Sequence, residues 1–273
     1  MISVLLVNHN GAALLPRCLE SLGPLGGSDL EAVLVDNASS DGSLALLAER
    51  FPEVKVEASR ENLGFAAALN RAAELARGDR LLLLNTDAWL APGALRRLAT
   101  RLDTAPRLGA VAPRLAYPDG RPQIAWAPDP SLVGEAVQQL RNRFEDRPWV
   151  EGWGASLLRL LLGPGWLTAA CLLVRRAAFA SVAGFDPEYF LYFEDVDFCL
   201  RLRRAGWRLG VEPGALCYHA KGGSGAPALT GHYRESQLRY YAKHRPRWEG
   251  VVLRSYLRRR GRLPGEGGSR PAA

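Results

Sequence analysis

The chain has 273 residues, of which 48% are hydrophobic and 23% charged, as in an ordinary globular protein with a sizeable core. Its net charge of +7 is concentrated at one end: residues 251–273 hold six arginines and one glutamate, which supply five of the seven charges. The remaining chain is close to neutral, so the composition argues against a nucleic-acid-binding surface and nucleic-acid partners.

The cysteine pattern and the hydropathy of the chain indicate the cellular compartment in which the protein is expected. The four cysteines, at positions 18, 171, 199 and 217, form no C-x-x-C pair. This excludes a zinc motif or a dense disulfide framework and favours reduced thiols in the cytoplasm. The apolar run 2–7 is too short for a signal peptide, and 166–174 falls short of the roughly 17–25 residues of a membrane-spanning helix. We expect a cytoplasmic protein without a membrane span.

The first 115 residues alternate between strand-like and helix-like segments. The predicted strands are 2–7, 30–35, 54–56, 80–84 and 109–113, and the predicted helices are 14–22, 43–50, 63–77 and 92–102. Strands that alternate with helices over short connections are typical of a mostly parallel sheet with right-handed crossovers. We therefore expect the α/β fold class, with helices flanking a central sheet.

The pattern is weaker in the second half. It predicts a helix at 132–144, a regular segment at 166–175, a helix at 193–205, an apolar run at 208–211 and a helix at 230–244. We divide the chain at residue 225 into a main domain, 1–225, and a helical extension, 226–260. The main domain has a nucleotide-binding half, 1–115, and an acceptor half, 116–225. The Gly/Pro/Arg-rich tail, 261–273, is predicted to be disordered.

Asp87 is the most informative residue. It ends Asn85-Thr86-Asp87, directly after the four leucines of 81–84. A leucine run indicates a central strand, and ligands bind at the carboxyl ends of the strands in open α/β sheets. We therefore place Asn85, Thr86 and Asp87 in a ligand site.

Asn8, Asn10, Asp36 and Asn37 follow the first two predicted strands, at the same edge of the sheet. A carboxylate such as Asp36 can accept hydrogen bonds from a ribose or a base there. The alternative is that Asp36, Asn37 and Asp41 only shape the turn and cap the next helix. No G-x-G-x-x-G or P-loop motif is present.

The segment Asn62, Leu63, Gly64 and Phe65 opens the alanine-rich helix. Gly64 would allow a ligand to approach the backbone, and a helix N-terminus favours anions. The simpler alternative is an N-cap by Asn62.

His219 precedes a glycine-rich loop at 222–225. Together with Asp87 it could bind a divalent cation on a diphosphate, because such ions often use only one or two protein carboxylates. An imidazole ligand shifts the preference toward manganese. A structural histidine is the alternative.

Glu194, Asp195 and Asp197 open a predicted helix among aromatic residues. Burial would raise the basicity of a carboxylate there toward that of a general base. Alternatively, the acids only complement the helix dipole, and Asp197 pairs with Arg201 four residues on.

Six motifs in this order resemble the inverting glycosyltransferases of family 2, with the GT-A fold, and in particular the bacterial rhamnosyltransferase-like branch. The resemblance runs from residue 2 to about residue 224. The motifs are Val7-Asn8-His9-Asn10, Val35 to Ser43, Asn62 to Ala66, Leu84 to Asp87, Gly184 to Pro187 and Phe193 to Cys199.

By this resemblance, Asp36 would contact the nucleotide base, with Asn8 and Asn62 in the same pocket. Asp87 and His219 would hold Mn²⁺ or Mg²⁺ on the diphosphate of a sugar nucleotide. The motif has one aspartate where the family often has two.

The resemblance also implies that Asp195, the second acid of the Glu194-Asp195 pair, is the catalytic base. It would deprotonate a hydroxyl of a glycan or lipid-linked acceptor, which attacks the anomeric carbon in one inverting step. Ala169-Ala170 stands where the family often has Gly-Ala.

Two other classes remain open. A nucleotidyltransferase would also use an α/β sheet and metal-bound phosphates, but the expected glycine-rich segment with a lysine is missing from the N-terminal region. The other is a non-catalytic relative that binds sugar nucleotides or glycans.

The C-terminal segment from Val251 to Leu257 mixes apolar residues with arginines. It is predicted to form an amphipathic helix that contacts an anionic membrane peripherally, near a lipid-linked acceptor. A solvated basic tail is the alternative.

Overall fold

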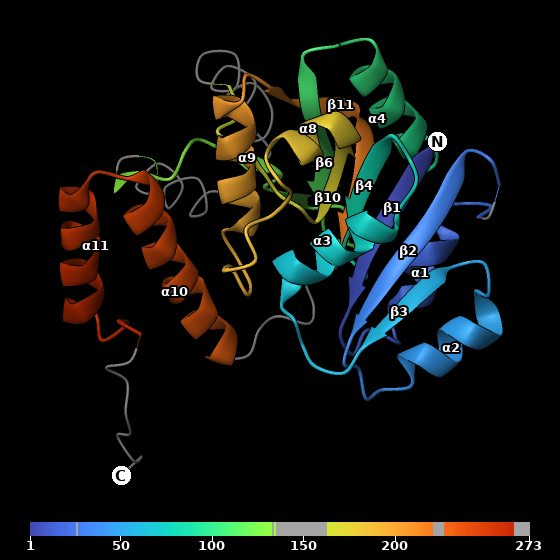
Figure 1. Cartoon of the computed structure of the whole chain (residues 1–273), viewed down its shortest axis with the longest axis horizontal. Helices are drawn as coiled ribbons and strands as arrows, with labels where there is room; N and C mark the ends of the chain where they lie inside the picture. The colour runs from blue at the N-terminus through green and yellow to red at the C-terminus, as the bar shows by residue number, and fades with distance from the viewer. Residues whose placement is uncertain (26, 133, 135–162, 221–226, 265–273) are drawn as a thin grey trace.

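The computed structural model describes residues 1–25, 27–132, 134, 163–220 and 227–264. Strands and helices alternate through the first half of the chain (Figure 1). The elements there are β1 (Ile2–Asn8), α1 (Leu15–Glu20), β2 (Leu30–Asn37), α2 (Ser43–Arg50), β3 (Lys55–Ser59), α3 (Phe65–Leu75), β4 (Arg80–Leu84), β5 (Ala88–Leu90), α4 (Ala94–Asp103) and β6 (Leu108–Ala116).

The second half is less regular. Its elements are β7 (Pro122–Gln123), β8 (Trp126–Ala127), β9 (Trp166–Leu167), β10 (Cys171–Arg175), α8 (Arg176–Ser181), α9 (Glu194–Arg204), β11 (Arg208–His219), α10 (Pro227–His244) and α11 (Arg247–Arg259). Strands β8 and β9 pair as a separate antiparallel ribbon.

Nine of the described strands form one mixed sheet, in the order β3-β2-β1-β4-β10-β6-β11-β5, with β7 paired to β6. Strands β3, β2, β1 and β4 are parallel, as are β6 and β11. Strand β10 runs antiparallel between β4 and β6. Strand β5 pairs antiparallel with β11, and β7 pairs antiparallel with β6. The expected α/β fold is confirmed, and the antiparallel strands come from the part of the chain where the sequence pattern is weakest.

Helices cover both faces of the sheet (Figure 1). On one face, α1, α2 and α4 supply residues such as Leu15, Leu47 and Leu98 to a core with the sheet. On the other, α3, α8 and α9 contribute Leu69, Phe179 and other residues. The leucines of β4 alternate between the two cores, which explains why that strand is continuously apolar.

Helices α10 and α11 lie beside α9 at one end of the molecule, with α11 outermost (Figure 1). A third core joins them to α9 and the loop before it. Its buried members are Tyr189, Phe193, Val196, Tyr240, Tyr241, Leu253 and Leu257. The division of the chain at residue 225 stays a prediction.

The structure extends or adds several elements. The run 208–211 continues to His219 through a register shift after Glu212, and β5, β7, β8 and α8 were not predicted. The segment 166–175 is two strands separated by Thr168, Ala169 and Ala170. The expected helix at 132–144 lies outside the described residues, except for 132 and 134. No helix among the described residues is both long and apolar enough to cross a bilayer.

Candidate active site

The strand order brings the predicted residues to one edge of the sheet. Strands β1, β2 and β4 are parallel, so Asn8, Asp36 and Asn85 lie at the same edge. Strand β11 ends there at His219, opposite the start of β5 at Ala88. Strand β10 begins at this edge too, since Cys171 pairs with Leu84. We call this edge the carboxyl rim.

Asp87 and His219 meet at the carboxyl rim. Nε2 of His219 lies 3.2 Å from Oδ1 of Asp87, and both side chains are mostly buried. Gln123 holds the histidine: its Nε2 donates to the His219 carbonyl oxygen at 2.6 Å, and its Oε1 lies 3.0 Å from Nδ1. We assign the proton to Nδ1, because Oε1 can only accept. Nε2 is then an unprotonated nitrogen that faces a carboxylate oxygen.

This donor set fits a divalent cation. Two atoms that bind one ion at roughly 2.1 Å in adjacent positions lie about 3 Å apart, close to the observed separation. The amide of Asn85 adjoins the pair: its Nδ2 lies 3.5 Å from Nε2 of His219, and its Oδ1 is buried without a hydrogen-bond partner. Among the described residues, no group of three or more His, Cys, Asp or Glu side chains could hold a metal, so the remaining ligands would be diphosphate oxygens and water.

Asp195 lies in the first turn of α9, next to the segment that enters β10. Its Oδ2 accepts from the Ala169 amide at 3.2 Å and its Oδ1 from the Val196 amide at 2.8 Å. The carbonyl oxygen of the following residue, Ala170, accepts a hydrogen bond from the Asn85 amide at 3.0 Å. Two residues in sequence therefore connect Asp195 to the Asn85-Thr86-Asp87 turn, and alanine at 169 still permits the backbone contact.

Burial raises the pKa of both acids of the pair. Desolvation raises the pKa of Asp195 to about 6, although hydrogen bonds from Ala169, Val196 and Thr168 oppose the shift. Glu194 is buried, and one of its carboxyl oxygens has no partner. Burial, and then the charge of Asp195, raise the pKa of Glu194 well above its ordinary value. Of the two acids, Asp195 is ionised at neutral pH, because its pKa of about 6 lies below 7.

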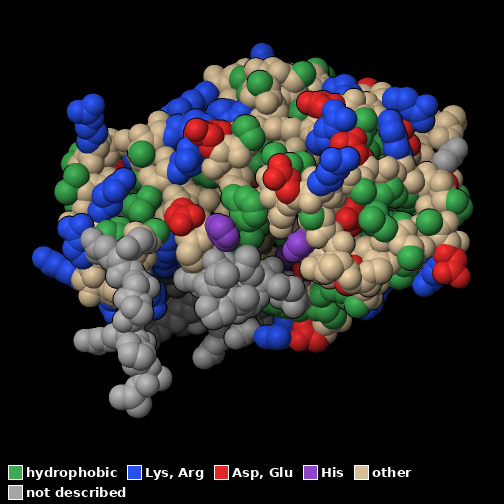
Figure 2. Space-filling model, turned by 60° about the horizontal axis from the view of Figure 1, so that its bottom comes forward, with side chains coloured by type: hydrophobic (Ala, Val, Ile, Leu, Met, Phe, Trp, Pro, Cys, Tyr) green, Lys and Arg blue, Asp and Glu red, His purple; other side chains and the backbone are tan. Residues whose placement is uncertain are grey.

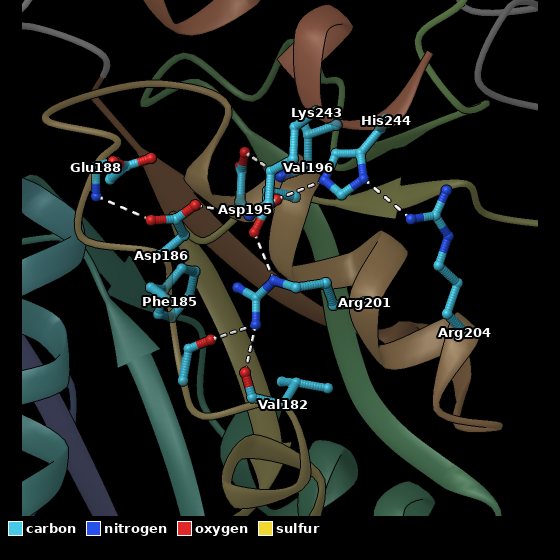
Figure 3. A network of polar contacts seen from close by, with 12 residues as sticks. Val182, Phe185, Asp186, Glu188, Asp195, Val196, Arg201, Arg204, Lys243 and His244 are labelled. Carbon is cyan, nitrogen blue, oxygen red and sulfur yellow. Dashed lines mark hydrogen bonds and ion pairs between the residues drawn. The ribbon is translucent and has the colours of Figure 1, made fainter. Parts of the chain in front are cut away.

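Asp197 has a different function. It is fully buried and accepts hydrogen bonds from Arg201 at 2.6 Å, Lys243 at 2.7 Å and His244 at 2.6 Å (Figure 3). Arg201 continues to the carbonyl oxygens of Val182 and Gly184, so the group ties α9 to α10 and to the loop after α8. The predicted pair of Asp197 with Arg201 is confirmed.

The loops after β1 and β2 are joined by side-chain hydrogen bonds. Asn8 Nδ2 donates to Asp36 Oδ1 at 2.8 Å and to Ser39 Oγ at 3.0 Å, and the Ser39 amide donates to Asp36 Oδ2 at 3.0 Å. Asn10 Oδ1 accepts from the Ser40 amide at 2.8 Å. Asp36 is 1% exposed, so its carboxylate shapes the turn, whereas Oδ1 of Asn8 is buried without a partner.

Asn37 fixes the loop before α3. Its amide group donates to Asn62 Oδ1 at 2.7 Å and accepts from the Leu63 amide at 2.8 Å. The expected N-cap by Asn62 is wrong: Gly64 occupies the cap position, and no side chain caps the helix.

Gly64 makes a close backbone contact, but with the protein itself. Its φ is +79°, and a Cβ there would lie 2.6 Å from the Phe190 carbonyl oxygen. The Phe65 amide donates to the same oxygen at 2.7 Å. The expectation that a ligand makes this contact is therefore corrected, because the loop before α9 makes it.

Sequence reasoning missed three contributors to the site: Gln123, Thr168 and Phe190. Each lies in an irregular segment, and each reaches the site through contacts distant in sequence. For Phe190 the sequence did give a signal, the aromatic run that precedes Glu194. For Gln123 and Thr168 it gave none.

The α/β fold brings a buried pair of acids and a candidate metal pair together at the carboxyl rim, an arrangement that suits an enzyme whose substrate carries a diphosphate. Residues 3–159 match the family described as Glycosyl transferase family 2. The chain is 32% identical, over 94% of its length and 89% of the relative's, to N-acetylglucosaminyl-diphospho-decaprenol L-rhamnosyltransferase of Mycobacterium tuberculosis strain H37Rv. The chain therefore belongs to glycosyltransferase family 2 and is a glycosyltransferase.

Solved structures share the fold. The mannosyltransferase PcManGT of Pyrobaculum calidifontis, in complex with GDP-Man and Mn²⁺, matches with a TM-score of 0.63 and 20% identity over 93% of this chain and 68% of that one. TarS residues 1–349 of S. aureus, in complex with UDP-GlcNAc, match with a TM-score of 0.58 and 17% identity, over 98% of this chain and 74% of the TarS chain. The GT-A fold that the motifs predicted is confirmed.

Proposed function

We propose that the protein transfers L-rhamnose, with inversion, from a nucleoside diphosphate sugar to a hydroxyl of a lipid-linked N-acetylglucosaminyl diphosphate. The observation that carries this proposal is the similarity to the mycobacterial rhamnosyltransferase over nearly the whole of both chains. The pairing of Asp87 with His219 next to Asp195 supports the chemistry. Membership of the family leaves the nucleotidyltransferase alternative without support.

In this proposal, Asp195 is the general base. The acceptor hydroxyl gives its proton to the Asp195 carboxylate as its oxygen bonds to the anomeric carbon, and the bond from that carbon to the diphosphate oxygen breaks. One displacement at the anomeric carbon inverts its configuration. Burial and the charge of Asp195 raise the pKa of Glu194, which favours its neutral form and so limits the negative charge next to Asp195.

We assign Asp87 and His219 as the metal ligands, with Mn²⁺ or Mg²⁺ as the ion. A bound divalent cation would neutralise the charge that develops on the departing diphosphate. Gln123 orients His219 so that Nε2 faces Asp87, as hydrogen-bonded outer partners commonly do for metal-binding histidines.

Replacement of Asp87 by asparagine is expected to lower turnover at least roughly 100-fold, about 3 kcal/mol, because the charged ligand is lost. Calorimetric titration of Mn²⁺ into protein with nucleoside diphosphate should show weaker binding in the variant. The matched control is Asp119→Asn, an exposed acid paired with Arg121, which should keep both properties. Wild-type metal affinity in Asp87→Asn would remove the assignment.

We assign the nucleotide base to the loops after β1 and β2, next to Asn8. Asn8 is itself buried: its amide nitrogen donates to Asp36 and Ser39 and so joins the two loops, and its Oδ1 has no hydrogen-bond partner. Asp36 orients Asn8 in this assignment, and Thr86 lies near Gly11. Asn10, Asn37 and Asn62 hold the surrounding loops.

Gly11→Ala tests this pocket. A Cβ at Gly11 would lie 2.4 Å from the Asn8 oxygen and 3.2 Å from Thr86 Oγ1, so the methyl group would displace the Asn8 side chain that joins these loops. We expect the KM for the donor to rise roughly tenfold, the equivalent of one hydrogen bond. Gly27→Ala, which has no atom within 4 Å of the added Cβ, is the matched control. An unchanged donor KM would contradict the assignment.

The overall proposal is tested by incubation of the protein with nucleoside diphosphate rhamnose donors of different bases and a lipid-linked N-acetylglucosaminyl diphosphate. Release of nucleoside diphosphate with a rhamnosylated product is the expected result. Donor binding without release would favour a non-catalytic relative. Because the acceptor would be anchored in a bilayer, the proposal includes a peripheral membrane contact of the basic C-terminal segment.

A further inference from the structure

Helix α11 has two apolar faces, and only one is covered. Leu253 and Leu257 are buried in the core shared with α10. Other large hydrophobic side chains of the helix lie outside this core and are exposed to solvent. Their relative accessibilities are 61% for Trp248, 62% for Val251, 47% for Val252 and 43% for Tyr256.

This exposure is concentrated rather than scattered. Eight large hydrophobic side chains are exposed among the described residues, and half of them lie on this 13-residue helix. They recur at spacings of three and four residues, which places them along one side of the helix. We call this set of four residues the α11 face. A contiguous apolar patch of this kind marks a site of contact with another surface.

Positive charge surrounds the α11 face. Residues 247–262 contain six arginines and one acid, Glu249. The acid is buried and bound by Arg245 at 2.6 Å, so it does not offset the exposed charge. The Arg260 guanidinium lies 5.7 Å from the centre of the Tyr256 ring. Basic and hydrophobic side chains alternate at the end of the molecule where α11 lies (Figure 2).

We infer that the α11 face docks onto the surface of an anionic lipid bilayer. The combination of a tryptophan and a tyrosine, two valines and a surrounding group of arginines suits the boundary between headgroups and acyl chains. Each arginine near an anionic surface adds attraction. The inference deepens the proposed function, because it assigns the surface that brings the enzyme to a lipid-linked acceptor.

The charge distribution disfavours other occupants. A two-fold dimer through this face would bring the arginines of one copy against those of the other, since each patch meets its own copy. A nucleic acid would use the arginines but would leave the exposed valines without an apolar partner.

Co-sedimentation of the full-length protein with vesicles tests the inference. We expect binding to vesicles that contain phosphatidylglycerol, weak binding to phosphatidylcholine alone, and a loss of affinity as salt is raised. Trp248→Ser/Val252→Ser should weaken vesicle binding at least roughly tenfold. Arg254→Gln/Arg259→Gln should weaken it roughly 25-fold, about fivefold for each charge. All four positions are exposed, so the fold should be unaffected.

Matched controls use the same substitutions elsewhere. Leu44→Ser/Val56→Ser removes two exposed apolar side chains, and Arg96→Gln/Arg101→Gln removes two exposed charges on α4. Both should bind vesicles as the wild type does. Equal binding by the α11 variants and the wild type, or no vesicle binding by the wild type, would overturn the inference. Self-association that the α11 variants abolish, without lipid binding, would assign the face to a second copy.

An activity comparison separates this inference from the proposed function. Transfer to a water-soluble acceptor with a short lipid chain should be unchanged in the α11 variants, whereas transfer to a vesicle-embedded acceptor should fall. If the wild type transfers sugar to neither acceptor, the proposed function is rejected. The vesicle-binding experiment still tests the docking of the α11 face, because it does not measure transfer.

Discussion

Replacement of Asp195 by asparagine should lower kcat by roughly 10²–10⁴-fold, the usual contribution of a positioned general base. Asparagine has nearly the same shape and can still accept the Ala169 amide, but it cannot take a proton from the acceptor. The KM for the donor should change little, because in the proposed function Asp195 acts on the acceptor and not on the donor. Steady-state kinetics on the variant provide the measurement.

The pH profile gives a second readout of the same residue. Burial raises the pKa of Asp195 to about 6, so the carboxylate is ionised above that pH and protonated below it. The kcat/KM of the wild type should therefore be constant near neutral pH and fall as the pH drops through about 6. In Asp195→Asn this descending limb should disappear from the residual activity.

Glu194→Gln is the matched control for this experiment. Burial raises the pKa of Glu194 well above its ordinary value and so favours its neutral form, which glutamine resembles in shape and charge. We expect most of the activity to remain. Asp195→Asn with wild-type turnover and metal dependence would show that another group removes the proton.

The sequence predicted the carboxyl rim well because the rim follows directly from strand order. Continuous apolar runs such as Leu81–Leu84 can only be central strands, and polar residues that follow parallel strands must lie together. Asn8, Asp36 and Asn85 were placed correctly for this reason. Only the motif resemblance related Asp195 to Asp87 and His219, because a local pattern does not reveal that β10 enters the sheet antiparallel at the same edge.

The partners of these residues were harder to predict. Gln123 belongs to a two-residue strand, and its two hydrogen bonds to His219 span 96 positions. Gly64 makes the close backbone contact that its residue type suggested, but its partner is Phe190, which is distant in sequence. In both cases the tertiary contact decided the role.

Hydrophobic periodicity also failed to predict the full length of β11 and the short helix α8. Strand β11 contains Pro213 and Gly214, which break the apolar pattern, and the pairing with β6 shifts its register there. Its last residues nevertheless continue to His219, which is how a run predicted to end at residue 211 reaches the site. Helix α8, with six residues, is too short to show a helical period.

Asp197→Ala should lower the free energy of unfolding by about 3–5 kcal/mol, the largest stability effect that we expect from a single substitution in α9. The carboxylate is fully buried and compensates Arg201, Lys243 and His244. Without it, these groups would be left close together beneath α10 with no anion between them. Chemical denaturation at neutral pH measures the loss. Asp119→Asn breaks only an exposed pair and should cost at most about 1 kcal/mol.

The pH dependence of stability identifies the same group. Burial alone would raise the pKa of Asp197, but hydrogen bonds from His244 and Lys243 and the pairing with Arg201 outweigh it and lower the pKa to about 2. A carboxyl with a depressed pKa in the folded state stabilises the protein above its unfolded pKa, near 4, and this contribution is lost as the pH falls toward 2. The difference corresponds to roughly 2–3 kcal/mol. Between pH 4 and pH 2 the wild type should therefore lose more stability than Asp197→Ala, and parallel curves for the two proteins would contradict the assignment of this buried charge as the link between α9 and α10.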